Sequence, residues 1–549
     1  MALFPKSSLF LFSACALLAQ SAVPARVGVG MVQRKLSLKE AVTQALSHNL
    51  EVEIQKTQVA SASAAERGAR GFYDPSFRWA PDFEARNTPA GSLLQGADGK
   101  LAEHFHNENF YFRQKLPFQG TSLGVDFVNS RSSSSNPFFT LNPLTSSQLL
   151  FSFTQPLLRN RVIDADRAQL QIRRKQLQIS ETEFRLKAIE IIVRTEQAYW
   201  DLVAARQDAQ VKQEAVELAR EQLARNRRMI DAGTLAPVEL SASEAELERR
   251  LDTWYSAVGV ITEAENLLKS LLAGGRDEEI WKDEIIPTDE NTLAPPETGD
   301  LPGAVAEALR QRPELEVVAG QQQINQVEQR QNADQVKPMV NLNAGYGSSG
   351  LGGSIRPGID PFTQSSLATY TRLNQLSELA GLAPITIPNV GGVPGSLVGG
   401  YGTTLSNLFG GRYQSVQVGL SLDLTIRNRT AEANLAQSAI GERRLKLQKR
   451  QVEQVIEMEV RNAMQALETA RQRRVAAEAG ARAAREKLES ETRLFQTGES
   501  TNFLVLTRQN EYADSRHREL VARLDFNKAV ARLQQAIGST LQSHRITLK

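Results

Sequence analysis

Few residues of this chain have the types and spacing that chemistry requires. Two of the five histidines, His104 and His106, are close enough to share a metal ion, but we expect them in a loop with no third ligand nearby. The single cysteine, Cys15, excludes disulfides and thiolate clusters as a framework. With no nucleophile motif and no phosphate-binding glycine loop, we expect no enzyme, no cofactor and no metal site. The other histidines are scattered and expected at the surface: His48, His517 and His544.

The charge balance argues against a nucleic-acid partner. The 549 residues include 64 lysines and arginines and 62 aspartates and glutamates, for a net charge of +2. Such a balance gives no strong field toward a polyanion. Only 6% of residues are aromatic and 23% are charged, which suits long solvated helices better than a compact enzyme.

The first 25 residues have the pattern of a secretory signal peptide. Lys6 supplies the positive start, Ser7 to Leu18 the apolar stretch, and Val23 to Ala25 a small-residue cleavage site. The stretch Phe12 to Cys15 loosely resembles a lipoprotein acylation site, but it lacks the usual leucine, so lipidation is the weaker alternative. No later run approaches the ~20 apolar residues of a spanning helix, so the exported chain should be soluble or cross a membrane as a closed barrel.

The chain repeats itself. The segment Leu36 to Ile54 (LSLKEAVTQALSHNLEVEI) returns as Asp300 to Val318 (DLPGAVAEALRQRPELEVV). Later positions return at nearly the same offset: Ala198, Leu202 and Gly233 become Ala463, Leu467 and Gly498. A near-constant offset over this length indicates a tandem duplication. The expected organisation is a signal peptide 1–25, a first repeat 26–275, a linker 276–299, a second repeat 300–542 and a C-terminal tail 543–549.

Each repeat should contain a helix, a strand region, a very long helix, a glycine turn and another long helix. Ser37 and Glu40 match a capping box at the first helix start. Gly233 and Gly498 suit the left-handed C-caps of the long helices, and Pro237 can open the helix after the first turn. The predicted helices are 37–70, 161–230, 237–273, 430–497 and 502–539.

The helix predicted over 161–230 would be about 100 Å long and has two apolar faces. Its apolar residues recur every seven positions in two series that lie ~200° apart around the helix. A two-stranded coiled coil needs only one such seam, so we expect neighbours on both sides, as in a wall, and a left-handed supercoil. The first series is Leu170, Leu177, Phe184, Ile191, Ala198 and Ala205; the second is Ile172, Ile179, Leu186, Val193 and Trp200.

Two segments alternate as the strands of a membrane barrel do. Phe151 and Phe153 share one face of 149–155, and valines and leucines alternate with polar residues over 416–424. For either segment alone, a half-buried strand in a soluble sandwich is the alternative.

Two further strand-region features are less regular. An extra hairpin is expected in the first repeat, with strands 109–116 and 122–129 around Pro117 to Gly120. The glycine- and proline-rich segment 343–411, with a short helix at 373–382, could be an external loop or a plug within a barrel.

Together and in duplicate, these segments resemble the TolC-type outer membrane efflux family over nearly the whole mature chain. The segments that carry the resemblance are the two repeat openings, Ser152 to Arg161 (SFTQPLLRNR), Gln197 to Arg206 (QAYWDLVAAR), and the tip segments Asp231 to Glu248 and Thr497 to Ser515. The resemblance implies an α+β membrane protein, in which duplicated long helices form a coiled-coil barrel and strands form a twelve-stranded transmembrane β-barrel, built by a homotrimer. If the extra hairpin joined that barrel, each protomer would contribute more than four strands.

The resemblance also implies a location and partners. The barrel would lie in the outer membrane of a Gram-negative-type bacterium, in contact with outer membrane lipid, and the helices would extend into the periplasm. The partners would be a periplasmic adaptor (membrane fusion protein) and an inner-membrane pump, with no nucleic acid.

A pore constriction is implied at the turns after Gly233 and Gly498. Glu239 occupies the position at which the family carries a pore-lining carboxylate, and three copies around an axis would attract cations. A solvated glutamate at a helix start is the alternative. The second repeat departs from the pattern, because Leu504 takes the equivalent position and Thr507 stands where a further acid is common. A double acidic ring is therefore not expected, and Leu504 could form an apolar constriction.

The implied function is a passive exit duct of a tripartite efflux or type I secretion system. A periplasmic adaptor without a pore is the main alternative, although adaptors need only one helical hairpin. An exported coiled-coil structural protein is a third reading, which predicts no lipid-facing strands. The sequence does not identify the cargo, which could be a drug, a metal, a lipid or a protein.

Overall fold

The computed structural model describes residues 26–547 except 31, 93–98, 234–235, 277, 290–294, 296–299, 358–360 and 388–391. The predicted signal peptide 1–25, with Cys15, lies outside the described residues. The chain divides into two compact units. Of the described residues, those within Met1–Ala62, Leu177–Gln321 and Leu445–Lys549 form the helical unit, and those within Ser63–Gln176 and Gln322–Arg444 form the strand unit.

The helix predicted from Ser37 to Arg70 is two helices. Ser37 and Glu40 form the predicted capping box: the Ser37 hydroxyl accepts the Glu40 N–H at 3.3 Å, and the Ser37 N–H donates to the Glu40 carboxylate at 3.0 Å. The helix nevertheless ends at Asn49, whose backbone is extended and whose side-chain oxygen accepts the Glu51 N–H at 2.9 Å, capping the next helix. The prediction of a single helix was therefore wrong. The two helices are α1 (Leu38–His48) and α2 (Leu50–Arg70).

The four long helices lie where the sequence predicts them. The first starts where the Asp164 carboxylate accepts the Arg167 N–H at 2.7 Å, and the last ends at Gly538, which has φ 89°. Among the described residues, no helix meets the length and hydropathy criteria of a membrane span. The helices are α3 (Ala165–Asp231), α4 (Val238–Leu272), α9 (Arg429–Thr497) and α10 (Asn502–Ile537).

Shorter elements accompany them. The predicted linker contains a short strand that pairs in parallel with a strand near the start of the described chain, β1 (Gln33–Leu36) with β6 (Glu284–Pro287). The remaining helices of the helical unit are α5 (Leu301–Gln311), α11 (Thr540–Ser543) and the 3₁₀ turn η3 (Glu279–Trp281), and α6 (Pro313–Gln335) follows α5 along the chain.

The middle of α3 buries both of its predicted seams. Ile191 and Ala198 of the first series and Val193 and Trp200 of the second are each no more than 3% exposed. Three of these side chains join the main apolar cluster, which includes side chains of α1 and α4. Full burial of a large apolar side chain contributes roughly 1.5–3 kcal/mol, so α3 is held from both sides, as its sequence predicts.

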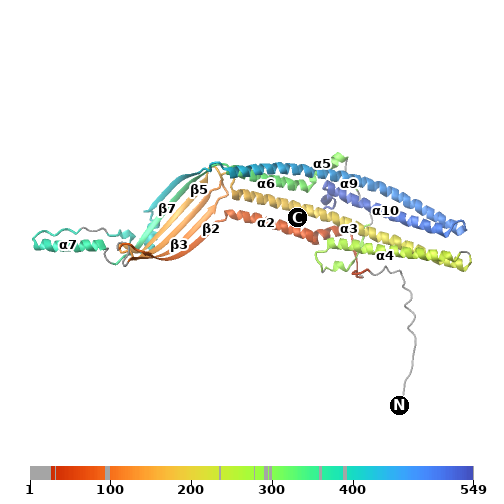
Figure 1. Ribbon diagram of the computed structural model, residues 1–549, viewed down its shortest axis with the longest axis horizontal. Helices are drawn as coiled ribbons and strands as arrows, with labels where there is room; N and C mark the ends of the chain where they lie inside the picture. The colour runs from red at the N-terminus through yellow and green to blue at the C-terminus, as the bar shows by residue number, and fades with distance from the viewer. Residues whose placement is uncertain are drawn as a thin grey trace, which may run out of the picture. The chain divides into compact units, whose positions relative to one another are not determined.

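The strand unit contains one antiparallel sheet of six strands in the order β2-β3-β4-β5-β7-β8 (Figure 1). The extra hairpin is confirmed: its two strands are β3 and β4, and both are longer than predicted. The strands are β2 (Ser76–Pro89), β3 (Lys100–Lys115), β4 (Ser122–Ser134), β5 (Leu141–Pro156), β7 (Met339–Ile355) and β8 (Gln414–Asp423), and the 3₁₀ turn η1 (Gly71–Tyr73) precedes them.

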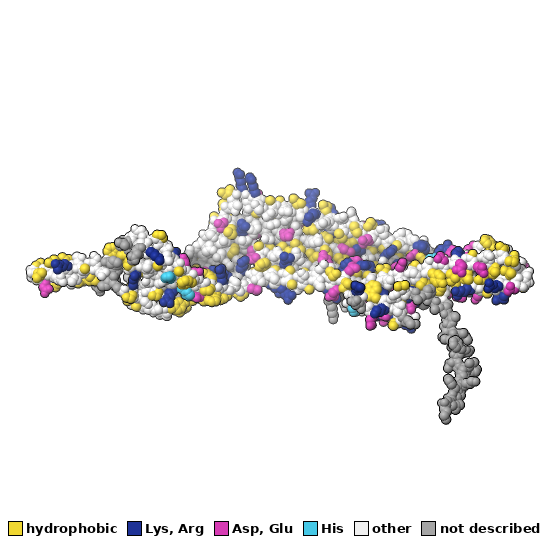
Figure 2. All heavy atoms as spheres, turned by 60° about the horizontal axis from the view of Figure 1, so that its bottom comes forward, with side chains coloured by type: hydrophobic (Ala, Val, Ile, Leu, Met, Phe, Trp, Pro, Cys, Tyr) yellow, Lys and Arg dark blue, Asp and Glu magenta, His cyan; other side chains and the backbone are white. Residues whose placement is uncertain are grey.

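The two faces of the sheet differ in polarity. Directly paired residues share a face, and one face carries large apolar side chains that remain 41–74% exposed. Hydrophobic side chains of the sheet lie at its surface beside histidine side chains (Figure 2). The opposite face carries polar side chains such as Asp82, Asn107 and Asn343. We call the exposed apolar residues the apolar belt: Phe77, Trp79, Phe83, Phe151, Tyr346, Val416, Val418, Leu420 and Leu422.

The segment between β7 and β8 contains two helices, α7 (Pro361–Leu379) and α8 (Tyr401–Phe409), and the 3₁₀ turn η4 (Gly395–Leu397). The helix predicted at 373–382 thus starts earlier, and α7 projects beyond the end of the sheet (Figure 1). α8 packs on β7, where a Cβ at Gly350 would come within 2.1 Å of the Thr404 carbonyl oxygen. Gly350 shares the face of Tyr346, so α8 lies on the side of the apolar belt and does not plug the polar side.

Candidate functional site

The turn after α3 depends on Gly233. Its φ of 72° lies in the left-handed region, and its N–H donates to the Ile230 carbonyl at 2.9 Å. No heavy atom lies within 4 Å of a Cβ built there, so the requirement for glycine is conformational. Residues 234 and 235 lie outside the described part of the chain. α4 then begins after Pro237, whose side chain forms no capping hydrogen bond.

The turn after α9 also has a left-handed glycine, and it is followed by a different helix start. Gly498 has φ 82°, and the Glu499 N–H closes the turn on the Leu494 carbonyl at 2.9 Å. Here Thr501 caps the next helix, because its hydroxyl accepts the Leu504 N–H at 3.3 Å. Both predicted tip glycines therefore end long helices in the left-handed conformation.

Glu239 points toward the second helical hairpin. Its carboxylate accepts the side-chain N–H of Asn502 at 3.0 Å, and the Asn502 side-chain oxygen accepts from Gln222 at 2.9 Å. Gln222 also donates to Asn226 at 2.9 Å, and Asn226 donates to the Ser243 hydroxyl at 2.7 Å. Gln222, Asn226, Ser243 and Asn502 are each no more than 4% exposed. We call these five residues the tip amide network; it joins α3 and α4 to the first turn of α10.

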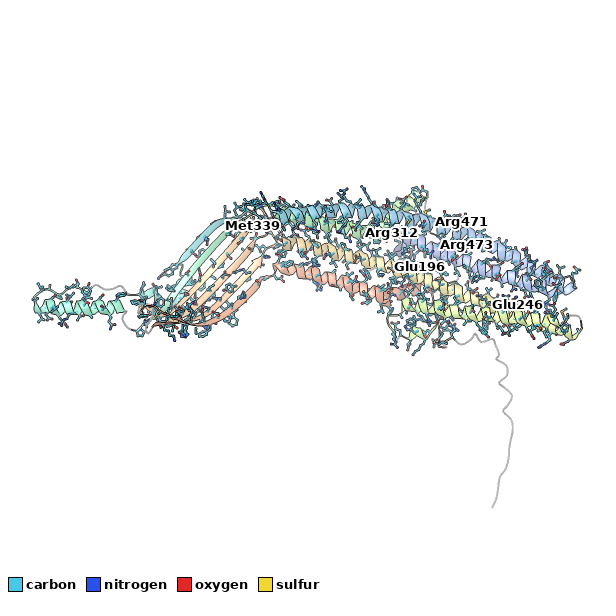
Figure 3. All side chains as sticks on the ribbon, in the orientation of Figure 1. Glu196, Glu246, Arg312, Met339, Arg471 and Arg473 are labelled. Carbon is cyan, nitrogen blue, oxygen red and sulfur yellow. The ribbon has the colours of Figure 1, made fainter. Side chains whose placement is uncertain are left out.

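A buried arginine makes a second junction. Arg250 of α4 is 4% exposed and donates to the Ala215 carbonyl of α3 at 3.0 Å. The same guanidinium donates to Gln509 and Asn510 of α10 at 3.3 and 3.2 Å, and to Glu246 at 2.8 Å. Glu246 lies along α4 between this junction and the tip turn (Figure 3). Burial alone would raise the pKa of Glu246, but hydrogen bonds from Arg249 and Arg250 outweigh it and lower that pKa below its usual value.

Farther from the turns, polar pairs link α3 to α10. His517 contacts Asp208 at 2.5 Å, and Lys528 pairs with Asp201. These side chains are part-exposed, and such pairs contribute about 0–1 kcal/mol each. These pairs therefore align α3 with α10 but add little to the free energy of unfolding.

The two other predicted tip residues lie on the first turns of α10. Leu504 is 38% exposed, beside Phe503 at 72%. Thr507 uses its hydroxyl to donate to the Phe503 carbonyl at 2.8 Å. The second repeat therefore presents apolar side chains to its surroundings at the place where Glu239 of the first repeat is held by a hydrogen bond.

Sequence reasoning missed the tip amide network, although a signal for it exists. Asn226 continues the seven-residue series of α3, and Ser243, Arg250 and Ala257 form such a series on α4. A polar residue at a seam position is buried by the same periodicity that buries its apolar neighbours, and it then requires a partner.

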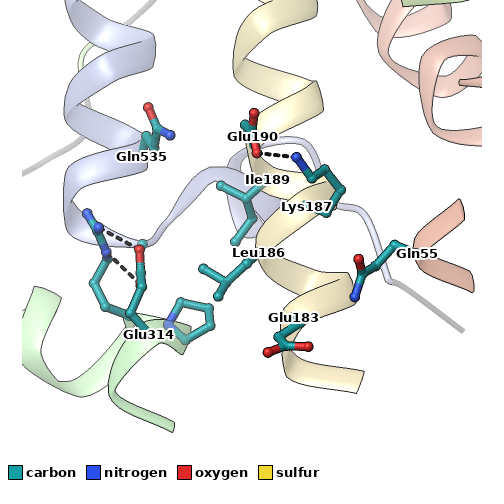
Figure 4. A pocket seen from close by; sticks show the side chains of 11 residues that line it. Gln55, Glu183, Leu186, Lys187, Ile189, Glu190, Glu314 and Gln535 are labelled. Atoms are coloured by element: carbon teal, nitrogen blue, oxygen red, sulfur yellow. Dashed lines mark hydrogen bonds and ion pairs between the residues drawn. The ribbon is translucent and has the colours of Figure 1, made fainter. Parts of the chain in front are cut away.

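One pocket of the helical unit lies beside α3 and α10, with a volume of about 420 Å³. Four of its five charged lining residues form two ion pairs, Lys187 with Glu190 at 2.7 Å and Arg312 with Glu314 at 2.6 Å (Figure 4), and the fifth is Glu183. Because both cations of the lining are paired with neighbouring carboxylates, the pocket offers no free positive charge to an anionic ligand.

The histidine pair of the sequence lies in a strand and not in the predicted loop. His104 and His106 are in β3, and His106 contacts the Glu108 carboxylate at 3.3 Å. Within the described part of the chain, no group of three or more potential ligands could hold a metal ion.

Comparison with known proteins gives a consistent result. The family model of the outer membrane efflux protein family matches residues 122–274 and 392–539. No curated protein matches at a significant level. The solved Campylobacter jejuni CmeC outer membrane channel is similar with TM-score 0.60 and 14% identity, over 92% of this chain and 86% of that chain.

Two further solved structures are similar. The open state of the Neisseria gonorrhoeae MtrE outer membrane channel gives TM-score 0.58 and 14% identity over 92% of this chain and 89% of that chain. The outer membrane protein VceC from Vibrio cholerae gives TM-score 0.56 and 15% identity over 91% and 96%. These likenesses establish the fold, an α-helical barrel wall joined to a transmembrane β domain. Since the family model covers more than half of the sequence, the chain belongs to the outer membrane efflux protein family, as a channel of the outer membrane with its helices in the periplasm.

Proposed function

We propose that the chain is the exit duct of a tripartite efflux or type I secretion system and passively exports cargo that an inner-membrane pump supplies. The main support is that one chain combines a surface suited to lipid with long helical hairpins that meet near their turns. The strand unit exposes an apolar belt suited to lipid. In the helical unit, side-chain hydrogen bonds join the two helical hairpins near their turns. A periplasmic adaptor without a pore, the alternative, has no use for the belt.

We propose a homotrimer as the working form. The edge strands β2 and β8 each pair on one side only within the described chain, and free strand edges do not persist in a membrane. Pairing β2 with β8 of a neighbouring copy would satisfy both edges. With six strands from each chain, three copies would close eighteen strands instead of the twelve implied by the resemblance, and the exit would be correspondingly wider.

We propose that the turns at Gly233 and Gly498 form the periplasmic entrance and the docking site for an adaptor. Leu504 and Phe503 provide exposed apolar surface there. Glu239 would reach the pore only when its hydrogen bond to Asn502 opens, so we expect the resting entrance to be less cation-selective than a free ring of carboxylates.

Single-particle imaging of the mature protein, extracted from outer membranes in detergent, tests this proposal. A hollow three-fold cylinder with eighteen strands is the expected result. A solid rod or a particle without a pore would contradict the duct and favour the adaptor. Cross-linking to co-expressed adaptors through cysteines placed beside Gly233 and Gly498 then tests the docking site, and the cargo follows from the pump that is captured.

A further inference from the structure

On three adjacent strands, β3, β4 and β5, the face that carries the apolar belt changes from apolar to polar at one level of the sheet; of the belt residues, Phe83 of β2 lies beyond that level, opposite His106. On this face, β3 changes from Phe110 to Glu108, and β4 changes from Phe127 to Asn129. The paired positions of the next strand change from Leu149 to Ser147. Adjacent strands thus switch from apolar to polar at paired positions, which is the pattern expected where a strand passes from hydrocarbon into the headgroup region. Since the helices are periplasmic, this boundary faces the outer leaflet.

A pocket of about 570 Å³ lies across this boundary. Phe110 lines it from the apolar side, and His106, Arg131 and Thr145 line it from the polar side. His106 and Arg131 are directly paired across β3 and β4, so they share the face of the apolar belt. The pocket therefore lies on the face of the sheet that carries the apolar belt.

The far wall of the pocket is the loop into α8, and hydrogen bonds hold it in place. The Tyr401 hydroxyl donates to the Asn129 side-chain oxygen at 2.9 Å, and the Asn129 amide donates to the Glu108 carbonyl at 2.9 Å. The Ser147 hydroxyl donates to the same Asn129 oxygen at 2.7 Å. Asn129 is only 4% exposed. A wall tied to a buried asparagine whose side chain makes three hydrogen bonds gives the pocket a defined shape.

Of the described charged side chains that line the pocket, Arg131 is the one without an ion-pair partner. Both Glu108 carboxylate oxygens are engaged, one by the Trp79 indole N–H at 2.7 Å and the other by His106 at 3.3 Å. Arg131 is exposed and forms no ion pair with any residue in the described part of the chain. An unpaired guanidinium beside an apolar surface is matched by a phosphate that is attached to acyl chains.

We infer that this pocket binds the phosphate-bearing headgroup of an outer-leaflet lipid. The Arg131 guanidinium contacts the phosphate, Tyr401 and Thr145 lie beside the sugar or glycerol, and the acyl chains run down the apolar belt from Phe110. The inference rests on the outer-membrane orientation and not on the cargo or on the pump. It assigns α8 a role, because α8 and its preceding loop complete the pocket on the lipid side of the sheet.

The test is a titration of the purified full-length protein with diphosphorylated lipid A and, in parallel, with fully dephosphorylated lipid A, read by native mass spectrometry. We expect the phosphorylated lipid to bind about tenfold more tightly, since only its phosphates can accept charge-assisted hydrogen bonds from the Arg131 guanidinium. Arg131→Gln should remove that preference, and Arg131→Lys should keep most of it. Arg78→Gln is the matched control, because Arg78 lies on the opposite, polar face of the same sheet.

Several outcomes would overturn the inference. Equal binding of the two lipids would do so, as would an unchanged preference in Arg131→Gln. Competition by inorganic phosphate at the same concentration as the lipid would show a free-anion site and would also contradict it. Because Arg131 is exposed, its variants should fold, and an unchanged single-channel conductance in planar bilayers checks that they do. Failure of the duct proposal would instead appear as a loss of conductance in the unmodified protein.

Discussion

The two turns of the helical unit share a left-handed glycine, and the helices that follow them differ in their side chains. Gly233 and Gly498 both adopt the left-handed conformation. The helix after Gly233 carries Ser243 and Arg250 inward, where both are buried among polar partners. The helix after Gly498 starts with Asn502, whose side chain donates a hydrogen bond to Glu239 of the first repeat. The next residue, Phe503, is exposed. Both copies thus keep the left-handed glycine, but they are unequal in their side chains: the first carries most of the polar residues that join the hairpins, and the second presents apolar surface.

The largest effect should come from Arg250→Ala. Removing a buried charged partner costs about 3 kcal/mol or more, because the Ala215 carbonyl loses its donor and Glu246 keeps only Arg249. We expect faster hydrogen–deuterium exchange in the first turns of α10, by about 100-fold, and a higher resting conductance. Arg508→Ala in the second repeat is the matched control: Arg508 is part-exposed on ion pairs within its own hairpin, which are worth under about 1 kcal/mol. Equal effects of the two variants would remove the proposed inequality.

Asn502→Ala should have the next largest effect. It leaves the Gln222 amide and the Glu239 carboxylate without a shared partner, at a cost of about 2 kcal/mol. Channel openings in planar bilayers should become more frequent and more cation-selective, since Glu239 is released. Glu239→Gln distinguishes the two roles of Glu239, because the amide oxygen can still accept from Asn502 but carries no charge. If Asn502→Ala left both opening and selectivity unchanged, the tip amide network would not hold the entrance.

Substituting either tip glycine should have equal effects, because here the repeats are alike. Gly233→Val and Gly498→Val each place a branched residue in the left-handed region at a cost of about 1–3 kcal/mol. We expect adaptor cross-linking and export to fall while insertion into the outer membrane is retained. Gly→Asn at each turn should be milder, since asparagine tolerates that conformation. Export and complex formation that survive both valine variants would contradict the assignment of the tips.

The smallest effect is a pH dependence that arises from Glu246 of the first repeat. The pKa of Glu246 is lowered in the folded protein by Arg249 and Arg250. A lowered folded pKa means that the carboxylate stabilises the fold above its unfolded pKa of about 4.3 and that this contribution is lost as the pH falls through the folded value. Exchange protection of α10 should therefore fall below about pH 4. In Glu246→Gln this step should be absent, and a step of the same size in the variant would assign it to other carboxylates.

Much of the helical unit could be predicted because periodicity and capping act locally. The seven-residue series of α3 identified Ile191 and Trp200 as buried from both sides, and Gly498 marked the end of α9. The break at Asn49 was missed, because an asparagine within a helical pattern can either face solvent or cap the next helix. Only the packing of Asn49 against the Leu271 carbonyl, which its side chain reaches at 3.1 Å, decides between them.

The strand unit was harder to predict because its contacts join distant segments. Alternation indicated strands at β5 and β8, but the sequence assigned His104 and His106 to a loop, although both lie within β3. Segment 343–411 gave no indication of its side of the sheet. The close approach of α8 to Gly350 and Gly352 decided it, since only residues without a Cβ admit that helix.

The sequence by itself determined the duplication, the long helices with their glycine ends and the apolar alternation of the strands. Each follows from the spacing of residues along one segment. The tertiary structure alone decided which polar seam residues meet, so that Asn502 serves Gln222 and Glu239 at once, and that six strands form one sheet. Hydrogen-bond partners and strand order depend on residues hundreds of positions apart, and no local pattern specifies which distant segment will satisfy a buried donor or an open edge.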